Sequence, residues 1–472
     1  MIGAATLAAV AIVTQDQASL RAAPSATSTR QAVLWQGELL EIRGRRLDHL
    51  QVYDYRRERG GYVHASLVHV QPVTEAEAPQ ILAVLRFLRD KPGSEALGIA
   101  YAAAYLRAAP DEAITAELFD ALGTMAERLG DRASRRGGAE SATAHLEVVG
   151  SYGVRFKAIE GDGAGRLCYD GDAYRRVLAM AASAAQQARA ALALTRPDCV
   201  DPAMRASERP AFELWRADLL DRIAPEQLAE LEPALRNRVR ARRAAVWATV
   251  GTQRARAGQA PASAVQRAID ELAAVDQGEL TDDDRRAVAD AALRVGAVRW
   301  GALPATAANP VPARGKPAIV TEPGEPGQTC VRLVDPARGH AELARRCTFG
   351  IVWPASARAA PDGRTLTLAV QNEAWTQLWV FRAQRGGWTV DPMSPSTDPA
   401  RPGYIEFAGW VPGGRKMLVA REWQDGTQFK RSFEVVSLDT LVAERRASAP
   451  DRLLTFSRWQ DPGWKRQTLS LR

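Results

Sequence analysis

The stretch from Thr14 to Val70 constrains the fold most, because short apolar runs alternate there with polar turns that contain glycine. Such alternation is typical of the short strands and tight turns of a small barrel. We therefore expect residues 12–72 to form a small β-barrel. The strand candidates are Val33–Trp35, Leu39–Ile42, Leu50–Tyr53 and Tyr62–His64, and the glycines that punctuate them are Gly37, Gly44, Gly60 and Gly61.

Three segments of this stretch resemble a bacterial Src-homology-three-like (SH3-like) domain. Leu20–Pro24 is similar to the opening loop of that family, Trp35–Gly37 to the turn before its second strand, and Gly61–Ser66 to its closing signature. Leu50 stands where the family usually has a tryptophan. The resemblance implies a five-stranded barrel that recognises peptides or cell-wall components in envelope proteins. The alternative is a docking module without a small ligand.

The aromatic side chains of this barrel are the candidate ligand contacts. They are Trp35, Tyr53, Tyr55 and Tyr62. An envelope protein or a peptidoglycan peptide is the partner that the resemblance implies. The histidines of the stretch are interpreted as structural, because strand alternation and turn position account for them; they are His49, His64 and His69.

An apolar run from Ile2 to Ala11 precedes the barrel and ends in Ala9-Val10-Ala11. Two small residues separated by one other residue form the pattern that signal peptidases accept. The run is too short to cross a bilayer, which takes about 20 apolar residues. We therefore expect residues 1–11 to be a signal peptide, and the mature protein to be periplasmic or secreted without an integral membrane segment. The alternative is that the run belongs to the first strand of the barrel.

The chain has four cysteines in two pairs that are local in sequence. Cysteines of exported proteins are usually oxidised, and four cysteines allow three pairings. We expect the local pairing, Cys168 with Cys199 and Cys330 with Cys347. The second pair flanks Asp335–Gly339, a turn signal between two strand-like runs, so its bridge would join neighbouring strands. A zinc site is the weaker alternative, because neither pair has the spacing of metal ligands.

The first pair requires a reversal of the chain. One continuous helix from Asp172 to Leu194 would hold its ends about 34 Å apart, whereas bridged Cα atoms lie within about 7 Å. Ser183 and Gln186 have the spacing of a capping box, which starts a new helix. The sequence therefore predicts a helical hairpin between the two cysteines.

Residues 79–301 have helical spacing over most of their length. A basic, glycine-containing loop, Arg132–Gly138, interrupts the pattern, and the residues after it, His145–Ile159, are expected to be extended or mixed. The flexible turn Glu160–Gly165 follows. Later helices are predicted over Ala211–Ile223, Pro225–Val250, Ser263–Val275 and Asp282–Trp300. We therefore expect a mainly α-helical middle domain.

Prolines concentrate between residues 302 and 327, which indicates a linker. Residues 328–472 then change to short strands that are rich in tryptophan. Three turns recur there at intervals of about 50 residues, which is a spacing found in propeller blades. The turns are Pro361–Arg364, Pro412–Arg415 and Pro462–Lys465, and the tryptophans before them are Trp353, Trp410 and Trp459.

These units resemble periplasmic propeller blades of the Tol-system type. The last unit would need the strands of Thr329–Cys347 to complete a sheet that ends with Gln467–Arg472. Three blades are fewer than a propeller ring usually has, so we expect a propeller-like or sandwich-like β-domain. The chain as a whole is predicted to be a multidomain α+β protein.

No group of residues has the composition and spacing of an active site. Cys168 precedes a helix, where a thiolate would be stabilised, but His340 is the only base that follows and a disulfide explains the cysteine better. The acidic residues around Asp170 and Asp172 lack the loop pattern of a calcium site, so we interpret them as helix caps. We expect no enzyme activity and no cofactor or metal.

The formal net charge of +7 rests mostly on arginine. The densest basic run, Arg236–Arg243, is expected to lie on the solvated face of a helix whose other face is apolar. Nucleic acid is therefore not an expected partner. In the β-domain most tryptophans are expected in the core, and Trp423, beside a turn, is expected to be the most exposed and a further candidate ligand contact.

These patterns predict a non-catalytic envelope scaffold or sensor that binds through the SH3-like module and the β-domain. A cell-wall (peptidoglycan) hydrolase, or a regulator of one, is the alternative function. A cytoplasmic protein that binds polyanions is a third, and it would require four free thiols.

Overall fold

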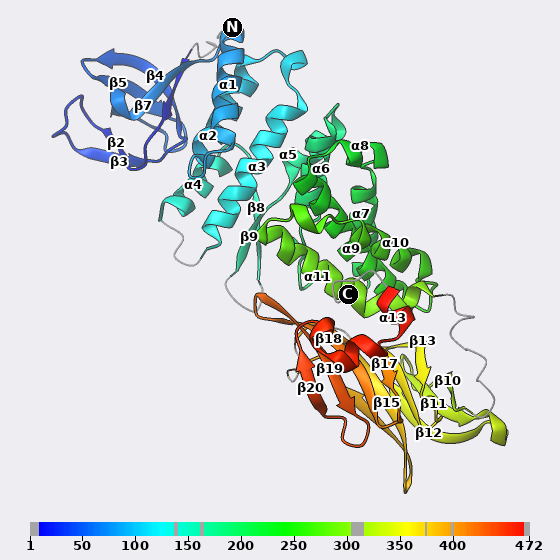
Figure 1. The fold of residues 1–472 in the computed structure, drawn as a ribbon. Coiled ribbons are helices and arrows are strands. Elements are labelled where there is room, and N and C mark those ends of the chain that lie inside the picture. Colours follow the sequence, from blue (N-terminus) through cyan, green and yellow to red (C-terminus); the bar gives the residue numbers. More distant parts are fainter. Residues whose placement is uncertain are drawn as a thin grey trace. The chain divides into compact units, whose positions relative to one another are not determined.

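The structure is a computed structural model, and it describes residues 9–135, 140–160, 165–303, 316–372, 375–396, 398 and 401–466 (Figure 1). The fold is mixed α+β, with helices in the middle of the chain and sheets before and after them. Contacts group the chain into two compact units, Met1–Ala206 with Arg222–Leu231, and Ser207–Asp221 with Glu232–Arg472. The helices of the predicted middle domain are thus divided between the two units. Within the described residues, no helix has the length and apolarity needed to span a membrane.

The first unit begins with a seven-stranded sheet in the order β3-β2-β6-β5-β4-β1-β7. Three of the four predicted strands lie within β4, β5 and β6, and the fourth overlaps β3. Among the described residues β3 and β7 each pair with one neighbour, so the pairing gives an open seven-stranded path and not the closed five-stranded barrel we expected. The strands are β1 (Ala9–Val13), β2 (Ala18–Arg21), β3 (Arg30–Leu34), β4 (Leu39–Arg46), β5 (His49–Asp54), β6 (Arg59–His64) and β7 (Val68–Pro72).

Strand β1 corrects the predicted boundary of the signal peptide. Val10 and Ile12 belong to a core shared with the helices, whereas Ala11 and Val13 belong to the core of the sheet. A strand that is buried on both faces reads as an unbroken apolar run, which is why residues 9–11 looked like the end of a leader. These residues instead pair with β4 and β7. Residues 1–8 lie outside the described part of the chain.

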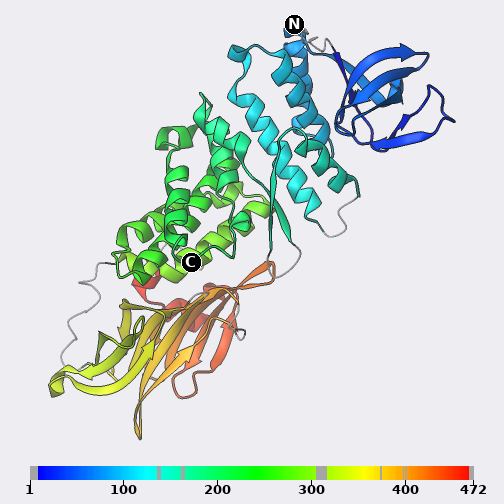
Figure 2. The same ribbon diagram turned by 180° about the vertical axis from the view of Figure 1, so that it is seen from behind.

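Helix α2 lies beside this sheet, and α1 and α3 pack against α2 (Figures 1 and 2). Residues 145–159, predicted to be extended or mixed, are mixed: helix α4 continues to Gly150 and buries His145, Val148 and Val149 at helical spacing, and strand β8 begins at Phe156. The other elements of the unit include a short hairpin, β8 and β9. The elements are α1 (Ala78–Arg89), α2 (Glu95–Ala108), α3 (Ala116–Ala133), α4 (Glu140–Gly150), β8 (Phe156–Ile159), β9 (Arg166–Tyr169), α5 (Asp172–Ala179), α6 (Ala184–Leu194) and α8 (Pro225–Glu230).

The segment between the first two cysteines reverses direction as predicted. The Ser183 hydroxyl accepts the backbone N–H of Gln186 at 3.3 Å, and Gln186 Oε1 accepts the backbone N–H of Ser183 at 2.9 Å. This capping box starts α6 after α5 has ended. At the start of α5, the carboxylate of Asp170 accepts the backbone N–H of Asp172 at 2.9 Å, which supports its interpretation as a helix-capping residue.

The described part of the second unit contains four α-helices before its sheets. The single helix predicted from Pro225 is broken at Leu231 and Glu232, both of which have extended backbone conformations. Glu232 precedes Pro233, and the proline ring disfavours the helical backbone conformation for the residue before it. The four helices are α7 (Arg209–Asp221), α9 (Pro233–Arg256), α10 (Ala262–Ala273) and α11 (Asp282–Val298).

Two four-stranded antiparallel meanders form the larger sheet of this unit, and β15 joins β17 in parallel at Trp375 and Thr376. The first two recurring turns occupy equivalent positions, because one joins β13 to β14 and the other joins β17 to β18. The predicted repeat is therefore present twice, once in each meander. The meanders are β13 (Ile351–Ala359), β14 (Thr365–Gln371), β15 (Trp375–Gln384) and β16 (Gly387–Met393), and β17 (Gly403–Val411), β18 (Lys416–Asp425), β19 (Gln428–Ser437) and β20 (Ala443–Ala447).

The third predicted repeat is helical and not a strand pair. Its tryptophan ends α12 (Leu454–Trp459), and its turn lies in α13 (Pro462–Arg466). Phe456 and Trp464 pack into an aromatic cluster with Phe433 of β19. The predicted final strand, residues 467–472, and part of the predicted linker, residues 304–315, both lie outside the described residues.

The strands expected to complete that repeat form a separate three-stranded sheet. It consists of β10 (Ala318–Pro323), β11 (Thr329–Asp335) and β12 (Ala341–Thr348). The linker is therefore shorter than predicted, because β10 lies within it. Among the described residues, the strand pairing closes no propeller ring.

Candidate binding cleft

Tyr53 and Tyr55 are the two predicted ligand contacts that the structure brings together. Their ring centroids lie 5.0 Å apart in an edge-to-face arrangement. The Arg43 guanidinium lies 3.9 Å from the centre of the Tyr53 ring. Tyr55 donates its hydroxyl hydrogen to Glu41 Oε2 at 2.8 Å, and this hydrogen bond to a carboxylate raises the pKa of Tyr55. The Tyr55 side chain is 62% exposed.

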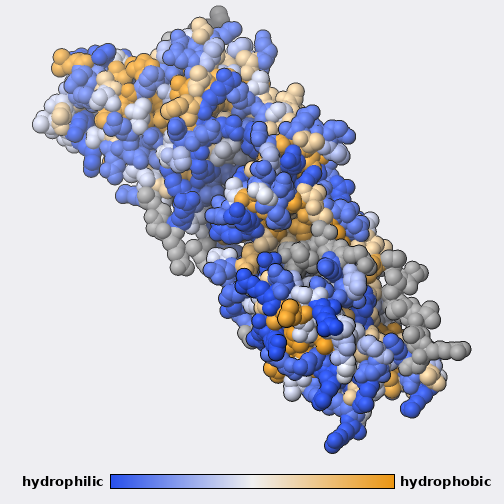
Figure 3. All heavy atoms as spheres, in the orientation of Figure 1, coloured by the Kyte–Doolittle hydropathy of each residue, from blue (hydrophilic) through white to orange (hydrophobic). Residues whose placement is uncertain are grey.

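The sheet has further exposed apolar side chains and a third tyrosine beside Tyr53. Leu47, in the turn between β4 and β5, and Val70 of β7 are exposed in addition to Tyr55, and Figure 3 shows apolar residues over the sheet. Tyr62 pairs with Gln51 in β5, two residues from Tyr53, so it lies on the same face as Tyr53 and is half-buried. We call Tyr53, Tyr55 and Tyr62 the tyrosine face.

The other two predicted contacts lie elsewhere. Trp35 packs edge-to-face against His145 of α4, with ring centroids 6.5 Å apart, so it helps to hold the sheet against the helices. Trp423 of β18 is half-buried. The prediction that it is the most exposed tryptophan of the β-domain was wrong, since Trp459 at the end of α12 is 36% exposed. The sequence placed Trp459 in a strand, and this misassignment explains the error.

Tyr55 also lines a cleft of about 320 Å³ in the first unit. The cleft lies between β4, the end of β5, the end of α2 and the residues that follow α4. Leu39 and Leu40 give it apolar walls. Its polar lining includes Glu38, Glu41, Tyr55, Arg56, Arg107 and Tyr152.

Two buried carboxylates of the cleft share one arginine. Arg57 Nη1 lies 2.7 Å from Glu38 Oε2 and 2.7 Å from Asp54 Oδ2, and its Nη2 donates to the carbonyl of Val33 at 3.1 Å. Glu38 is 4% exposed and Asp54 is 2% exposed. The hydrogen bond to Glu38 raises the pKa of Arg57 above its ordinary value, so the arginine remains charged. The carboxylates are thus held in fixed positions.

Tyr152 and Gly37 join the cleft to the contact between the sheet and helix α2. Tyr152 donates its hydroxyl hydrogen to the carbonyl of Gly37 at 2.5 Å, and burial raises the pKa of Tyr152. Gly37 has φ +92°, and a Cβ at this position would lie 2.5 Å from the carbonyl oxygen of Ala96. The turn that the SH3 resemblance singled out is therefore packed directly against α2.

A chain of buried polar contacts links the same turn region to three helices. His145 Nε2 lies 2.6 Å from Asp16 Oδ1, and its Nδ1 lies 2.7 Å from Arg132 Nη2. Arg132 and Arg128 both pair with Glu95, which is 0% exposed. Since an arginine can only donate, His145 accepts with Nδ1 and donates with Nε2. No local sequence pattern indicates this network, because its members are far apart in the chain.

Both predicted disulfides are present. Cys168 and Cys199 have Cα atoms 5.8 Å apart, and Cys330 and Cys347 are paired residues of β11 and β12. None of the described cysteines is free. Cys168 therefore has no thiol with which to act as a nucleophile.

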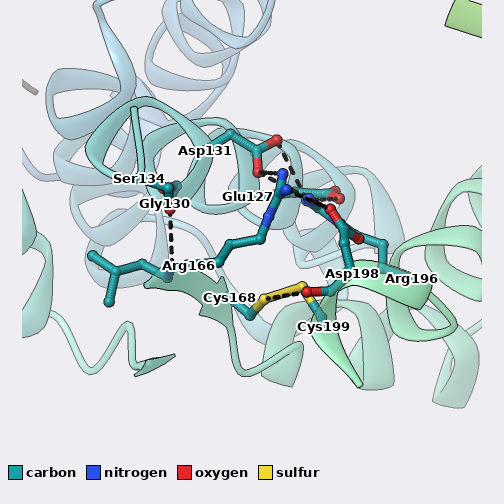
Figure 4. Close-up of a disulfide and its surroundings, with 10 residues drawn as sticks. Glu127, Gly130, Asp131, Ser134, Arg166, Cys168, Arg196, Asp198 and Cys199 are labelled. Carbon is teal, nitrogen blue, oxygen red and sulfur yellow. Dashed lines mark hydrogen bonds and ion pairs between the residues drawn. A yellow bond between two sulfur atoms is a disulfide. The ribbon is translucent and has the colours of Figure 1, made fainter. Parts of the chain in front are cut away.

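Ion pairs surround the first disulfide (Figure 4). Arg196 lies 2.6 Å from Glu127 and 2.9 Å from Asp131, both on α3. Arg166 pairs with Asp131 and with Asp198, each at 2.9 Å. The bridge and these ion pairs fasten residues 165–200 to α3.

The basic run of α9 is only partly a solvated face, because one of its arginines is buried. Arg243 is 3% exposed and lies 3.2 Å from Glu271 and 3.5 Å from Asp221, and it donates to the carbonyl of Leu220. Arg238 is exposed but pairs with Asp284 at 2.6 Å. The sequence showed the apolar side of this helix but not the carboxylates on α7, α10 and α11 that receive its arginines. Within the described residues, no group of three or more acidic, histidine or cysteine side chains is placed to hold a metal ion.

Comparisons with family models, with curated proteins and with solved structures found no match to this chain.

Proposed function

We propose that this chain is a non-catalytic binding protein of the cell envelope, periplasmic or secreted, which binds a peptide segment through the tyrosine face of its N-terminal sheet. The observation that carries the proposal is the pair of nearly touching rings, half-buried Tyr53 and exposed Tyr55, beside a cleft in the same unit. Tyrosine provides a large and rigid contact area at a low cost in conformational entropy, and it offers a hydroxyl for hydrogen bonding.

The disulfides support the cellular location. Both cysteine pairs are bridged, and disulfides persist mainly in oxidising compartments. Fractionation of intact cells tests this part: we expect the protein in the periplasm or the medium, with no thiol that reacts with an alkylating reagent before reduction. A protein found in the cytoplasm with alkylatable thiols would overturn the location.

The binding role is tested with labelled peptides taken from envelope proteins and from soluble peptidoglycan fragments. Their binding to the purified protein is measured by fluorescence anisotropy. We expect at least one peptide to bind, and Tyr55→Ala to weaken its binding at least tenfold. Phe87→Ala is the matched control, because Phe87 is an aromatic residue of α1 that is also exposed, at 64%.

Two results would overturn the binding proposal. One is the absence of binding by any of these peptides, and the other is an equal loss of binding in the Tyr55→Ala and Phe87→Ala variants. Release of soluble fragments from purified peptidoglycan by the protein would instead refute its non-catalytic character.

A further inference from the structure

Arg107 is a charged donor in the cleft that the described residues leave without an ion pair or hydrogen bond. It lies near the end of α2 and is exposed. Arg56 lines the same cleft, but it already donates to Glu147 at 2.8 Å and lies 3.7 Å from Glu38. A guanidinium presents several N–H donors in one plane, which matches the two oxygens of a carboxylate. Arg107 is thus available for an anionic ligand.

The charges around Arg107 favour a ligand with a single negative charge. Three carboxylates line the cleft, and arginines offset only part of their charge, because one arginine, Arg57, pairs with both Glu38 and Asp54, and Arg43 pairs with Glu41 at 3.2 Å. The remaining negative charge repels a dianion such as phosphate more strongly than an anion with one charge. A carboxylate carries less charge, and it is planar like the guanidinium.

The apolar walls of the cleft suit the rest of such a ligand. An apolar side chain of the ligand would meet Leu39 and Leu40. The hydroxyls of Tyr55 and Tyr152 are engaged within the protein, because they donate to Glu41 and to the carbonyl of Gly37.

We propose that the cleft binds the free carboxylate at the end of a peptide, with Arg107 as its charge partner. The inference rests on the proposed function and deepens it, because it makes a chain terminus the feature that the binding site recognises. The volume of about 320 Å³ lies near the small end of the range for ligand pockets. The terminal residues of a peptide therefore fit the cleft, whereas a folded partner does not enter it.

The test uses the full chain and N-acetyl-trialanine, as the free acid and as the C-terminal amide, with binding measured by isothermal titration calorimetry. We expect the acid to bind at least tenfold more tightly than the amide. Arg107→Gln should remove this preference. Arg46→Gln is the matched control, because Arg46 is exposed at the end of β4, outside the cleft, and has no ion pair among the described residues. Thermal unfolding verifies that both variants fold.

Three results would overturn the inference. The first is equal affinity for the acid and the amide, or no binding of either. The second is a preference for the acid that survives Arg107→Gln. The third is displacement of the acid by an equal concentration of inorganic phosphate, which would make the cleft a general anion site. These failures are distinguishable from failure of the proposed function. Peptides with blocked ends would still bind the tyrosine face and still respond to Tyr55→Ala.

Discussion

The N-terminal sheet and the C-terminal sheet are fastened to their helices by different chemistry. At the N-terminal sheet, Gly37 packs on the backbone of α2, and His145 hydrogen-bonds across to the sheet. At the C-terminal sheet, the ring of Tyr404 rests on Gly296 of α11, and Trp353 rests on Gly301. The first contact combines this polar network with the apolar packing of Val10 and Ile12, whereas the second combines aromatic rings with one buried ion pair, Arg299 with Glu406.

This difference determines how each region should respond to change. Buried polar groups specify one arrangement, but removing one partner leaves the other unsatisfied at a cost of about 1–3 kcal/mol. Aromatic packing depends on shape and area, and it does not depend on protonation. Within each region the polar groups should therefore be the more specific and the more sensitive to pH, and the close aromatic contacts the more sensitive to volume, and the predictions below test this contrast.

The largest expected effect is the loss of a disulfide, and the two bridges should differ. Replacing Cys168 and Cys199 by serine should lower the free energy of unfolding by about 4 kcal/mol, and replacing Cys330 and Cys347 by about 3 kcal/mol. The first bridge closes a sequence separation of 31 residues and the second one of 17. A longer loop loses more entropy when it is closed in the unfolded chain. Urea unfolding without reductant measures the loss of stability in each double variant. A larger loss at the second bridge would contradict the model of loop entropy.

Gly37→Ala tests the polar contact at the N-terminal sheet. The positive φ and the Ala96 carbonyl oxygen at 2.5 Å both oppose a side chain, and we expect a loss of about 3 kcal/mol. Gly60→Ala in β6 is the control, because its Cβ would meet the nearest atom at 3.7 Å. Urea unfolding of the two variants compares them. Similar stability of both would mean that Gly37 is not required for docking of the sheet.

Gly296→Ala tests the aromatic contact at the C-terminal sheet. A Cβ there would lie 2.3 Å from the ring of Tyr404, which is 1% exposed and has little room to move. We expect a net loss of about 1–2 kcal/mol, since overpacking is partly offset by the higher helix propensity of alanine. Gly150→Ala, at the end of α4, has no atom within 4 Å and should not destabilise. Thermal unfolding measures the stability of both variants. An unchanged melting temperature of the Gly296→Ala variant would show that the aromatic contact can relax.

Features that depend on neighbouring residues could be predicted from the sequence. The capping box of Ser183 and the bridges of both cysteine pairs follow from local spacing and geometry. The first two recurring turns were also found, because their strands lie close in sequence. Period and turn chemistry are sufficient for such elements.

Features that depend on distant residues could not be predicted. Strand β1 resembles a leader, because its two buried faces belong to two different cores. The cleft joins Glu38, Tyr55, Arg107 and Tyr152, whose positions along the chain carry no common pattern. Only tertiary packing brings such residues together, so the sequence suggested Tyr55 as a candidate contact but gave no reason to consider Arg107, which lines the same cleft.

The smallest expected effect is a difference in the response of the two regions to pH. Burial alone would raise the pKa of Glu95, but the N–H of Gly93, Arg128 and the charge of Arg132 lower it below its ordinary value of 4.5. A carboxyl group with a lowered pKa stabilises the fold above its unfolded pKa. That contribution is lost as the pH falls below 4.5 through the folded pKa, so the α2–α3 contact should weaken in acid.

The carboxyls around Arg243 in the second unit should respond in the opposite direction. Burial raises the pKa of Asp221 above 3.8 and of Glu271 above 4.5, despite the charge of Arg243. Their contribution to stability is greatest at low pH and is lost as the pH rises through the raised values. Hydrogen exchange between pH 3 and 6, corrected for intrinsic rates, should therefore show less protection in acid for α2 and α3 but not for α7 and α10. Glu95→Gln should remove the response of α2 and α3 alone, and an unchanged response would mean that other carboxylates of the first unit cause it.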